Sequence, residues 1–210
     1  MKSLHFIILV LLSTNVIAQK YEPDRIRFHN KEYDYRFHHL EQYFNYYPEK
    51  RIVPNKDSTI INRNYIAYYE IYNDEIFLRD IKIKSAENGE FISVRNKFSP
   101  STEERIPLRW INGVVQIGLG SDDFKKDSIH PMNTSNKVFE INRGKIKREV
   151  NFGKDEMRIF KNFQLDKFRN TIEFDKISYK LRNNGYSENE IFLHISDNIL
   201  YYSRKIYLQK

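Results

Sequence analysis

The chain of 210 residues changes its hydrophobic pattern once, near Gly153. Before this glycine, short runs rich in tyrosine and isoleucine are separated by turn-forming pairs of residues, which is typical of β-hairpins. After it, apolar residues recur at the spacing of an α-helix. Strands followed by helices predict an α+β fold, in which an antiparallel sheet built from hairpins is followed by C-terminal helices. We expect mainly β structure to about residue 152 and mainly helix beyond it.

Two strands, residues 64–72 and 75–84, form the clearest predicted hairpin, and Asn73-Asp74 forms its turn. Apolar residues on both faces of these strands indicate a position in the middle of the sheet. The turn fixes the predicted register: Ile71 faces Ile76, Tyr69 faces Leu78, and Glu70 lies diagonal to Arg79 on the opposite face.

Two further hairpins are predicted at residues 25–35 and 137–152. The second is amphipathic, and a regular register places Glu140 opposite Lys147 on its polar face. Its other face collects five apolar residues: Phe139, Ile141, Ile146, Val150 and Phe152.

Shorter elements lie between these hairpins. Apolar residues at helical spacing predict a helix over residues 40–47, which Pro48 ends because proline cannot continue it. Single strands are expected at residues 91–95 and 114–117.

The sequence after Gly153 predicts three helical segments. The first begins around Met157, and the second ends at Gly185, since glycine is a common helix terminator. The third is the best specified, because Ser187 and Glu190 form a capping box. One apolar stripe runs along this last segment: Ile191, Ile195, Ile199, Tyr202 and Ile206.

Residues 1–18 have the pattern of a cleavable secretory signal peptide. Lys2 supplies a positive charge, residues 6–12 form an apolar core, and Ala18 is a small residue at the cleavage site. This core is shorter than the roughly 20 apolar residues of a spanning helix, so we expect no transmembrane helix after cleavage. The sequence predicts a single domain, residues 19–210, exported to the periplasm or the extracellular space.

The chain contains no cysteine. It therefore has no disulfide framework and no thiolate metal site, and its stability must come from packing. The lipid attachment of bacterial lipoproteins also needs a cysteine, so we expect an exported protein that is not lipidated.

The charge of the predicted mature chain is moderately basic. Without Lys2 it has 34 basic and 28 acidic residues, a formal charge of +6. Acidic residues are interspersed among the basic ones, which favours a role in solubility and argues against nucleic acid as a partner.

One set of scattered positions forms a further pattern: Ser58-Thr59, Arg63, Tyr65, Glu70-Ile71, Ile76-Phe77-Leu78, Trp110-x-x-Gly113 and Gly120. This pattern resembles that of a family of uncharacterised small bacterial proteins. The resemblance covers roughly residues 26–152 and implies a related fold, with no established activity and no catalytic residues.

The candidates for metal binding and catalysis are few. His38 and Glu41 are three residues apart on a predicted helix, but no further ligand follows at a metal-binding spacing, so we expect no metal and no cofactor. No nucleophile motif is present, and the catalytic residues are unknown. Four carboxylates lie in predicted strands: Glu32, Asp34, Glu70 and Asp80. A regular register places Asp80 on one face with Ala67 and Leu78, where it is either a buried carboxylate or, as structural ion pairs are more common, a sheet-end acid paired with a lysine.

These observations favour a non-enzymatic, exported bacterial protein that binds another envelope or secreted protein. The predicted binding residues are Tyr65, Tyr68, Tyr72 and Arg79 on the central strand pair. One version is an immunity-like protein that protects against an envelope-acting toxin. The alternatives are a glycan or peptidoglycan hydrolase using paired carboxylates, and a protein that binds anionic lipid through its C-terminal helices.

Overall fold

The computed structural model describes residues 22–52, 65–85, 87–100, 102–119 and 135–209. The predicted signal peptide and four positions of the family pattern (Ser58, Thr59, Arg63 and Gly120) lie outside these residues. The described strands are β1 (Asp24–Phe28), β2 (Lys31–Tyr35), β3 (Tyr65–Tyr72), β4 (Glu75–Lys84), β5 (Phe91–Ser93), β6 (Ile106–Pro107), β7 (Gly113–Leu119), β8 (Ser135–Asn142) and β9 (Lys145–Phe152). The described helices are α2 (His39–Tyr46), the 3-10 turn η1 (Pro48–Lys50), α3 (Arg95–Phe98), α4 (Lys154–Phe168), α5 (Ile172–Asn183), α6 (Glu188–Asp197) and α7 (Ile199–Tyr202).

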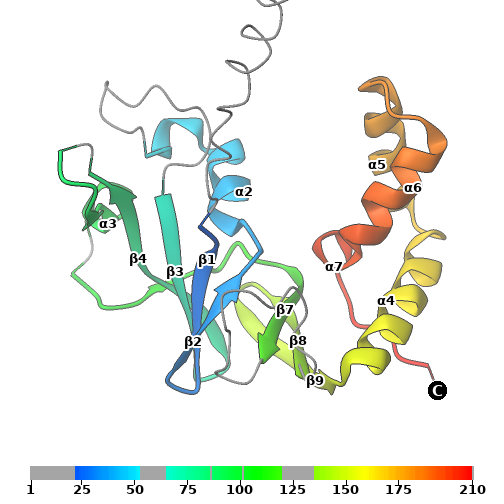
Figure 1. Cartoon of the computed structure of the whole chain (residues 1–210), viewed down its shortest axis with the longest axis horizontal. Helices are drawn as coiled ribbons and strands as arrows, with labels where there is room; N and C mark the ends of the chain where they lie inside the picture. Colours follow the sequence, from blue (N-terminus) through cyan, green and yellow to red (C-terminus); the bar gives the residue numbers. More distant parts are fainter. Residues whose placement is uncertain (1–21, 53–64, 86, 101, 120–134, 210) are drawn as a thin grey trace, which may run out of the picture.

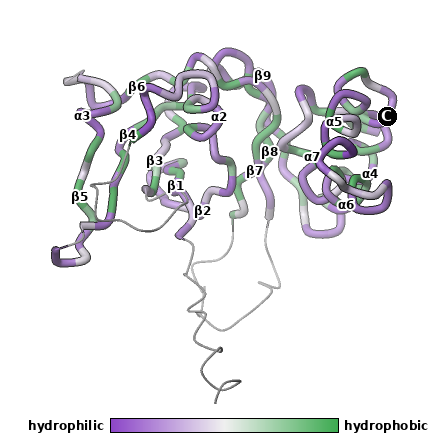
Figure 2. Tube along the Cα trace, turned by 90° about the horizontal axis from the view of Figure 1, so that it is seen from above, coloured by the Kyte–Doolittle hydropathy of each residue, from purple (hydrophilic) through white to green (hydrophobic). Residues whose placement is uncertain are grey.

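The strands form one mostly antiparallel sheet, followed by the C-terminal helices, so the predicted α+β class is confirmed (Figure 1). Its order is β2-β1-β3-β4-β9-β8-β7, with β5 and β6 also paired to β4 and β1 parallel to β3. Glu75 opposite Lys145 is the bridge between β4 and β9. The end strands β2 and β7 approach each other, so the sheet curves around its interior (Figure 2).

The main hydrophobic core lies inside this curved sheet. Alternate residues of β1, β3, β4, β7 and β8 point inward, and α2 adds Leu40 and Phe44 across one end. A second core lies on the outer side of β7, β8 and β9, where Val114 and Val138 pack against the C-terminal helices. In Figure 1 these helices form a separate layer beside the sheet. No helix of the described residues is long and apolar enough to cross a membrane.

The predicted register of the β3–β4 hairpin is confirmed. Ile71 faces Ile76, and Tyr69 faces Leu78. Both turn residues, Asn73 and Asp74, have positive φ, as in the type I′ turn that suits the twist of a hairpin. The pair also lies in the middle of the strand order, as the apolar residues on both faces predicted.

A β-bulge at Arg79 corrects the expectation for Asp80. Tyr69 pairs with Leu78 and Tyr68 pairs with Asp80, so Arg79 is the extra residue of β4. The bulge reverses the alternation beyond it, because one added residue moves each later side chain to the other face. The predicted position of Asp80 beside Ala67 was therefore wrong: Ala67 pairs with Ile81, and Asp80 lies on the outer face.

A second bulge corrects the register of the β8–β9 hairpin. Ile141 pairs with Ile146, but Glu140 pairs with Arg148, which leaves Lys147 as the extra residue. The prediction that Glu140 faces Lys147 was wrong for this reason. Beyond the bulge, Val150 and Phe152 turn to the side of the C-terminal helices, where the second core includes them.

The C-terminal segment departs from the predicted single helix. The capping box of Ser187 and Glu190 is present, but α6 ends at Asp197 and α7 ends at Tyr202. Ile206 still reaches the second core from the extended segment that follows α7. The shorter predicted elements also need adjustment, because the strand expected over residues 91–95 ends at Ser93 and α3 begins at Arg95.

The extended C-terminal segment is held by two polar side chains, Gln164 and Glu140. Gln164 of α4 is fully buried, and its amide donates to the carbonyl of Lys205 and accepts from the backbone N–H of Tyr207 at 2.8 Å. Between these bonds, the backbone N–H of Ile206 donates to Glu140 of β8 at 2.8 Å. The segment thus connects the helices to the sheet.

Candidate functional site

The outer face of β1, β3 and β4 carries polar and aromatic side chains. We call it the Tyr68 face and define it by eight residues: Arg25, Arg27, Tyr68, Glu70, Tyr72, Arg79, Asp80 and Lys82. These residues share a face because β1 places its two arginines beside Tyr68 and Glu70, and the bulge adds Arg79 and Asp80 to the same side. The C-terminal helices pack on the other part of the sheet and do not lie over this face (Figure 1).

A hollow of about 400 Å³ lies on the Tyr68 face. It is built by two neighbouring hairpins, by β5 and by the segment around α3, so it exists only in the folded chain. Its lining consists mainly of charged residues and includes two tyrosines: Arg27, Glu32, Tyr68, Tyr69, Arg79, Asp80, Lys82, Ser93, Arg95 and Glu104.

Tyr68 is the tyrosine of this hollow that lies on the outer face, whereas Tyr69 belongs to the main core. The ammonium of Lys82 lies 4.8 Å from the centre of its ring, a cation–π arrangement. Burial, followed by the charge on Glu32, raises the pKa of Tyr68. The phenol therefore stays protonated at neutral pH and can donate a hydrogen bond to a ligand.

Tyr72 lies on the same face and is 47% exposed. The guanidinium of Arg105 lies 4.3 Å from the centre of its ring. Arg105 is itself held by Glu70, which accepts a hydrogen bond from its Nε at 2.6 Å, and this bond raises the pKa of Arg105. The ring of Tyr72 is thus stacked against an arginine whose position is already fixed.

A network of two arginines and two glutamates links Tyr72 to the hollow. Glu70 is 4% exposed and lies 3.8 Å from Nε of Arg79, as its predicted diagonal position requires. Arg79 also donates to Glu104 at 2.9 Å. Charged groups that are paired in this way resist rearrangement, so the network presents Tyr72 and Arg79 on a rigid support.

Arg95 differs from the other arginines of the hollow. Its Nε and Nη2 atoms are buried and have no hydrogen-bond partner within the part of the chain that the structure describes. These two atoms form the edge of a guanidinium that matches the two oxygens of a carboxylate. A buried donor without a partner is costly, so an acceptor that reached Arg95 would satisfy two donors that the described residues leave open. Sequence reasoning placed Arg95 at the end of a strand and missed it, because no local pattern distinguishes it.

The carboxylates of the face already have donors. Asp80 accepts from the hydroxyl of Ser93 at 2.6 Å and from the backbone N–H of Ile81 at 2.8 Å. Asp34, at the edge of the sheet, is paired with Arg25. A carboxylate that is paired in this way holds its donor groups in place, because hydrogen bonds to a charged acceptor are strong.

Tyr65 does not belong to this face. It was predicted as an exposed binding residue, but it is only 6% exposed and belongs to the main core. Its hydroxyl donates to Glu41 at 2.8 Å. The reason is strand alternation, because Tyr65 shares the inner face with Tyr69, whereas Tyr68 and Tyr72 point outward.

His38 and Glu41, the tentative metal pair of the sequence, interact with different partners. Glu41 pairs with Arg51 at 2.9 Å, while Nδ1 of His38 lies 3.8 Å from a carboxylate oxygen of Asp24. Within the described residues, no group of three histidine, aspartate or glutamate side chains is placed to hold a metal ion.

His39, by contrast, is buried, and its ring packs against that of Tyr69 in β3. Its Nε2 lies 2.7 Å from the hydroxyl of Tyr35. Burial, with a smaller effect of His38, lowers the pKa of His39 from 6.5 to about 3, so the imidazole is neutral. Burial, followed by the charge on Asp24, raises the pKa of Tyr35, which stays protonated. The pair is a buried hydrogen bond between two neutral groups.

Compared with models of known protein families, with curated proteins and with solved structures, the chain matches none of them. The family resemblance of residues 26–152 stays a prediction, and the function has to be argued from the geometry above.

Proposed function

We propose that this chain is an exported bacterial protein, cleaved after Ala18, that binds another protein or an envelope component through the Tyr68 face and has no catalytic role. The observation that supports this proposal is Arg95, whose buried guanidinium edge has no acceptor among the described residues and which lines a hollow together with Tyr68 and Arg79. A partner that inserts a carboxylate would supply the missing acceptor.

The composition of the face supports the same proposal. Tyrosine and arginine are the residues that most often dominate binding energy at protein interfaces, because they combine a large apolar area with directed polar groups. Tyr68 and Tyr72 are both stacked against cations, which reduces the side-chain entropy lost on binding. The partner would therefore meet a surface that is already ordered.

Site-specific photo-crosslinking from within the face tests the proposal. A benzoylphenylalanine at Tyr72 is expected to capture one species from envelope fractions at low salt, in stoichiometric amount. The same probe at Tyr179, which is 64% exposed on α5, serves as the matched control and should not capture it. Loss of the crosslink in Arg95→Ala would tie capture to the hollow. Equal crosslinking from both positions would contradict the proposal.

The alternative of a glycan or peptidoglycan hydrolase also has an observation in its favour. Three carboxylates, Glu32, Asp80 and Glu104, line the same hollow. Asp80 and Glu104 are already bonded to Ser93 and Arg79, which makes them less suited to act on a substrate. If the purified protein released fragments from peptidoglycan, and Glu32→Gln abolished that release, the hydrolase would replace the binding proposal.

A further inference from the structure

A second hollow, of about 540 Å³, lies where the β3–β4 and β8–β9 turns meet. Its floor is made largely of backbone. The N–H of Ile76 donates to the carbonyl of Gly144 at 2.9 Å, and the N–H of Ile146 donates to the carbonyl of Asp74 at 2.8 Å. These reciprocal bonds join the two turns, so the floor has a fixed shape.

Gly144 is required at this junction. Its φ is +75°, and a Cβ atom there would lie only 2.8 Å from the carbonyl oxygen of Leu108. Glycine therefore permits the close approach of the segment at Leu108, which forms another wall of the hollow. The N–H of Gly144 donates to Ile111 at 2.9 Å, which fixes this wall as well.

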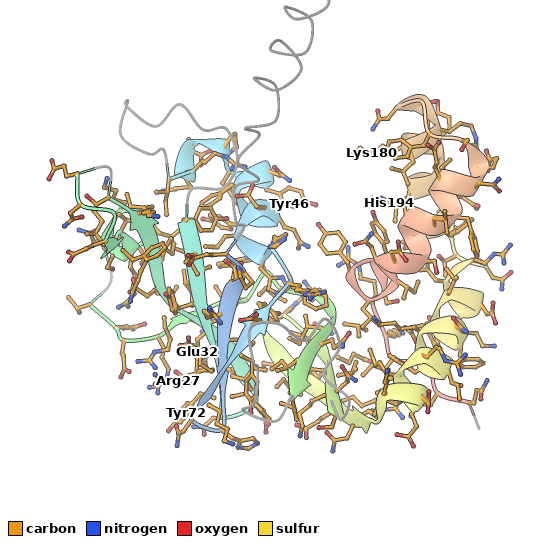
Figure 3. All side chains as sticks on the ribbon, in the orientation of Figure 1. Arg27, Glu32, Tyr46, Tyr72, Lys180 and His194 are labelled. Atoms are coloured by element: carbon orange, nitrogen blue, oxygen red, sulfur yellow. The ribbon has the colours of Figure 1, made fainter. Side chains whose placement is uncertain are left out.

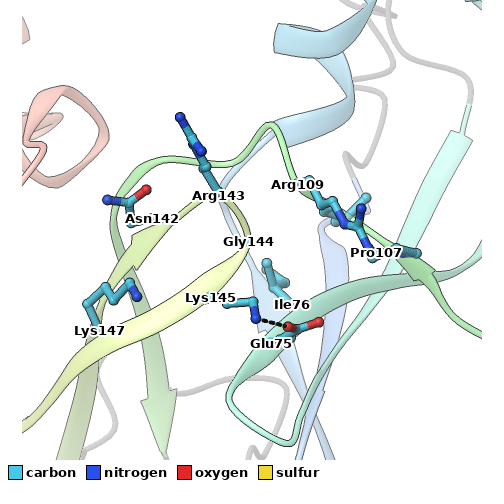
Figure 4. Close-up of a pocket in the computed structure, with 10 residues that line it drawn as sticks. Glu75, Ile76, Pro107, Arg109, Asn142, Arg143, Gly144, Lys145 and Lys147 are labelled. Carbon is cyan, nitrogen blue, oxygen red and sulfur yellow. Dashed lines mark ion pairs between the residues drawn. The ribbon is translucent and has the colours of Figure 1, made fainter.

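Basic side chains surround this floor, and Figure 4 shows them with the single acidic residue. Lys145 pairs with Glu75 at 3.1 Å. Arg109, Arg143 and Lys147 line the same hollow and form no ion pair within the described residues. The four basic residues and one carboxylate leave a formal charge of +3.

Arginines outside the hollow are of both kinds, with and without a carboxylate partner among the described residues. Five arginines outside the hollow have a carboxylate partner: Arg25, Arg51, Arg79, Arg105 and Arg182. The bulge in β9 also contributes, since a regular register would have placed Lys147 opposite Glu140 and neutralised it. The bulge puts Arg148 in that position and leaves Lys147 at the hollow.

We propose that this hollow binds a ligand that carries at least two phosphate groups. Guanidinium groups match the paired oxygens of phosphate, and an excess charge of +3 needs more than one singly charged anion to balance it. The volume also exceeds the need of one small anion. The inference is independent of the Tyr68 face, because the residues of the two hollows differ.

Titration calorimetry with sodium tripolyphosphate at low ionic strength tests the proposal. The variant Arg143→Asn/Lys147→Gln removes two of the unpaired charges, and asparagine suits the positive φ of Arg143. We expect binding to weaken by about tenfold for each charge removed. The control Lys50→Gln/Lys180→Gln removes the same charge from exposed positions outside the hollow and should bind as the unaltered protein does.

Three results would overturn the proposal: no binding of tripolyphosphate, an equal loss in the control variant, or binding of citrate as tight as that of tripolyphosphate. If the double variant does not fold, the amide chemical shifts of the unaltered protein test the proposal instead. Tripolyphosphate must then shift the amide signals of Gly144 and Lys145 and leave those of α5 unchanged.

Vesicles identify the source of the phosphate. Sedimentation with vesicles that contain cardiolipin, a lipid with two phosphate groups in its headgroup, would support a lipid ligand if the double variant loses this binding and the control retains it. Tripolyphosphate binding without vesicle binding would support a soluble phosphorylated ligand.

Discussion

The two outer faces of the curved sheet differ in what covers them. On β7, β8 and β9 the outward residues include Val114, Val138 and Val150, and the C-terminal helices bury them. On β1, β3 and β4 the outward residues are those of the Tyr68 face, and no C-terminal helix lies over them (Figure 3). Both faces enclose the same interior. The outward residues are thus apolar where the helices pack and polar or aromatic on the face that we propose binds a partner.

The largest expected loss of stability comes from placing a charge on the face of β7, β8 and β9 that the C-terminal helices cover. Val138 is fully buried, so Val138→Asp would leave a carboxylate without a partner between sheet and helices. We expect a loss of about 3–5 kcal/mol in the free energy of unfolding, measured by urea denaturation.

The matched substitution on the uncovered face is Tyr72→Asp. It exchanges an exposed residue that already has Arg105 beside it, so we expect a change below about 1 kcal/mol. Equal losses in the free energy of unfolding for Val138→Asp and Tyr72→Asp would contradict the distinction between the two faces.

Acid is expected to destabilise the interior that both faces share, through His39. Its pKa is about 3 in the folded protein and 6.5 when unfolded, so only the unfolded chain binds a proton between these values. The stability is complete above pH 6.5 and falls by about 1.4 kcal/mol for each pH unit below it, or about 2 kcal/mol at pH 5. The loss levels off below about pH 3.

Denaturation of His39→Gln at pH 7 and pH 5 measures this effect. Glutamine keeps a polar atom near the Tyr35 hydroxyl but does not titrate, so the loss between the two pH values should shrink by about 2 kcal/mol. His29→Asn, at an exposed turn position, is the control. Unchanged acid sensitivity in His39→Gln would contradict the assignment.

A smaller effect is expected at the connection between the helices and the sheet. Gln164→Leu removes both amide bonds to the C-terminal segment and should cost about 1–3 kcal/mol. Hydrogen exchange at the amide of Tyr207 should accelerate in the same variant. Asn162→Leu, exposed on the same helix, should leave that exchange rate unchanged.

Tyr72→Ala has the smallest expected effect on stability and tests directly whether the two outer faces of the sheet have different roles. Tyr72→Ala should change the free energy of unfolding by no more than about 0.5 kcal/mol, because the side chain is half exposed. Partner capture from the Tyr68 face should nevertheless fall. A loss of stability without a loss of capture would assign Tyr72 a structural role.

Sequence patterns were sufficient wherever a structural decision was local. Asn73-Asp74 set the turn and the first pairs of the β3–β4 hairpin, and the capping box of Ser187 and Glu190 set the start of α6. The change of pattern at Gly153 gave the α+β class. Each decision involves residues within a few positions of one another, whose backbone preferences act without help from the rest of the chain.

Tertiary structure decided the candidate sites. The bulges at Arg79 and Lys147 reverse strand alternation, and no residue type announces them, because a bulge depends on how two strands meet the surrounding sheet. Arg95 joins Tyr68 only because α3 packs beside β4. The sequence by itself therefore determined most of the elements and the register next to the turns, while contacts between distant segments decided which side chains line the two hollows.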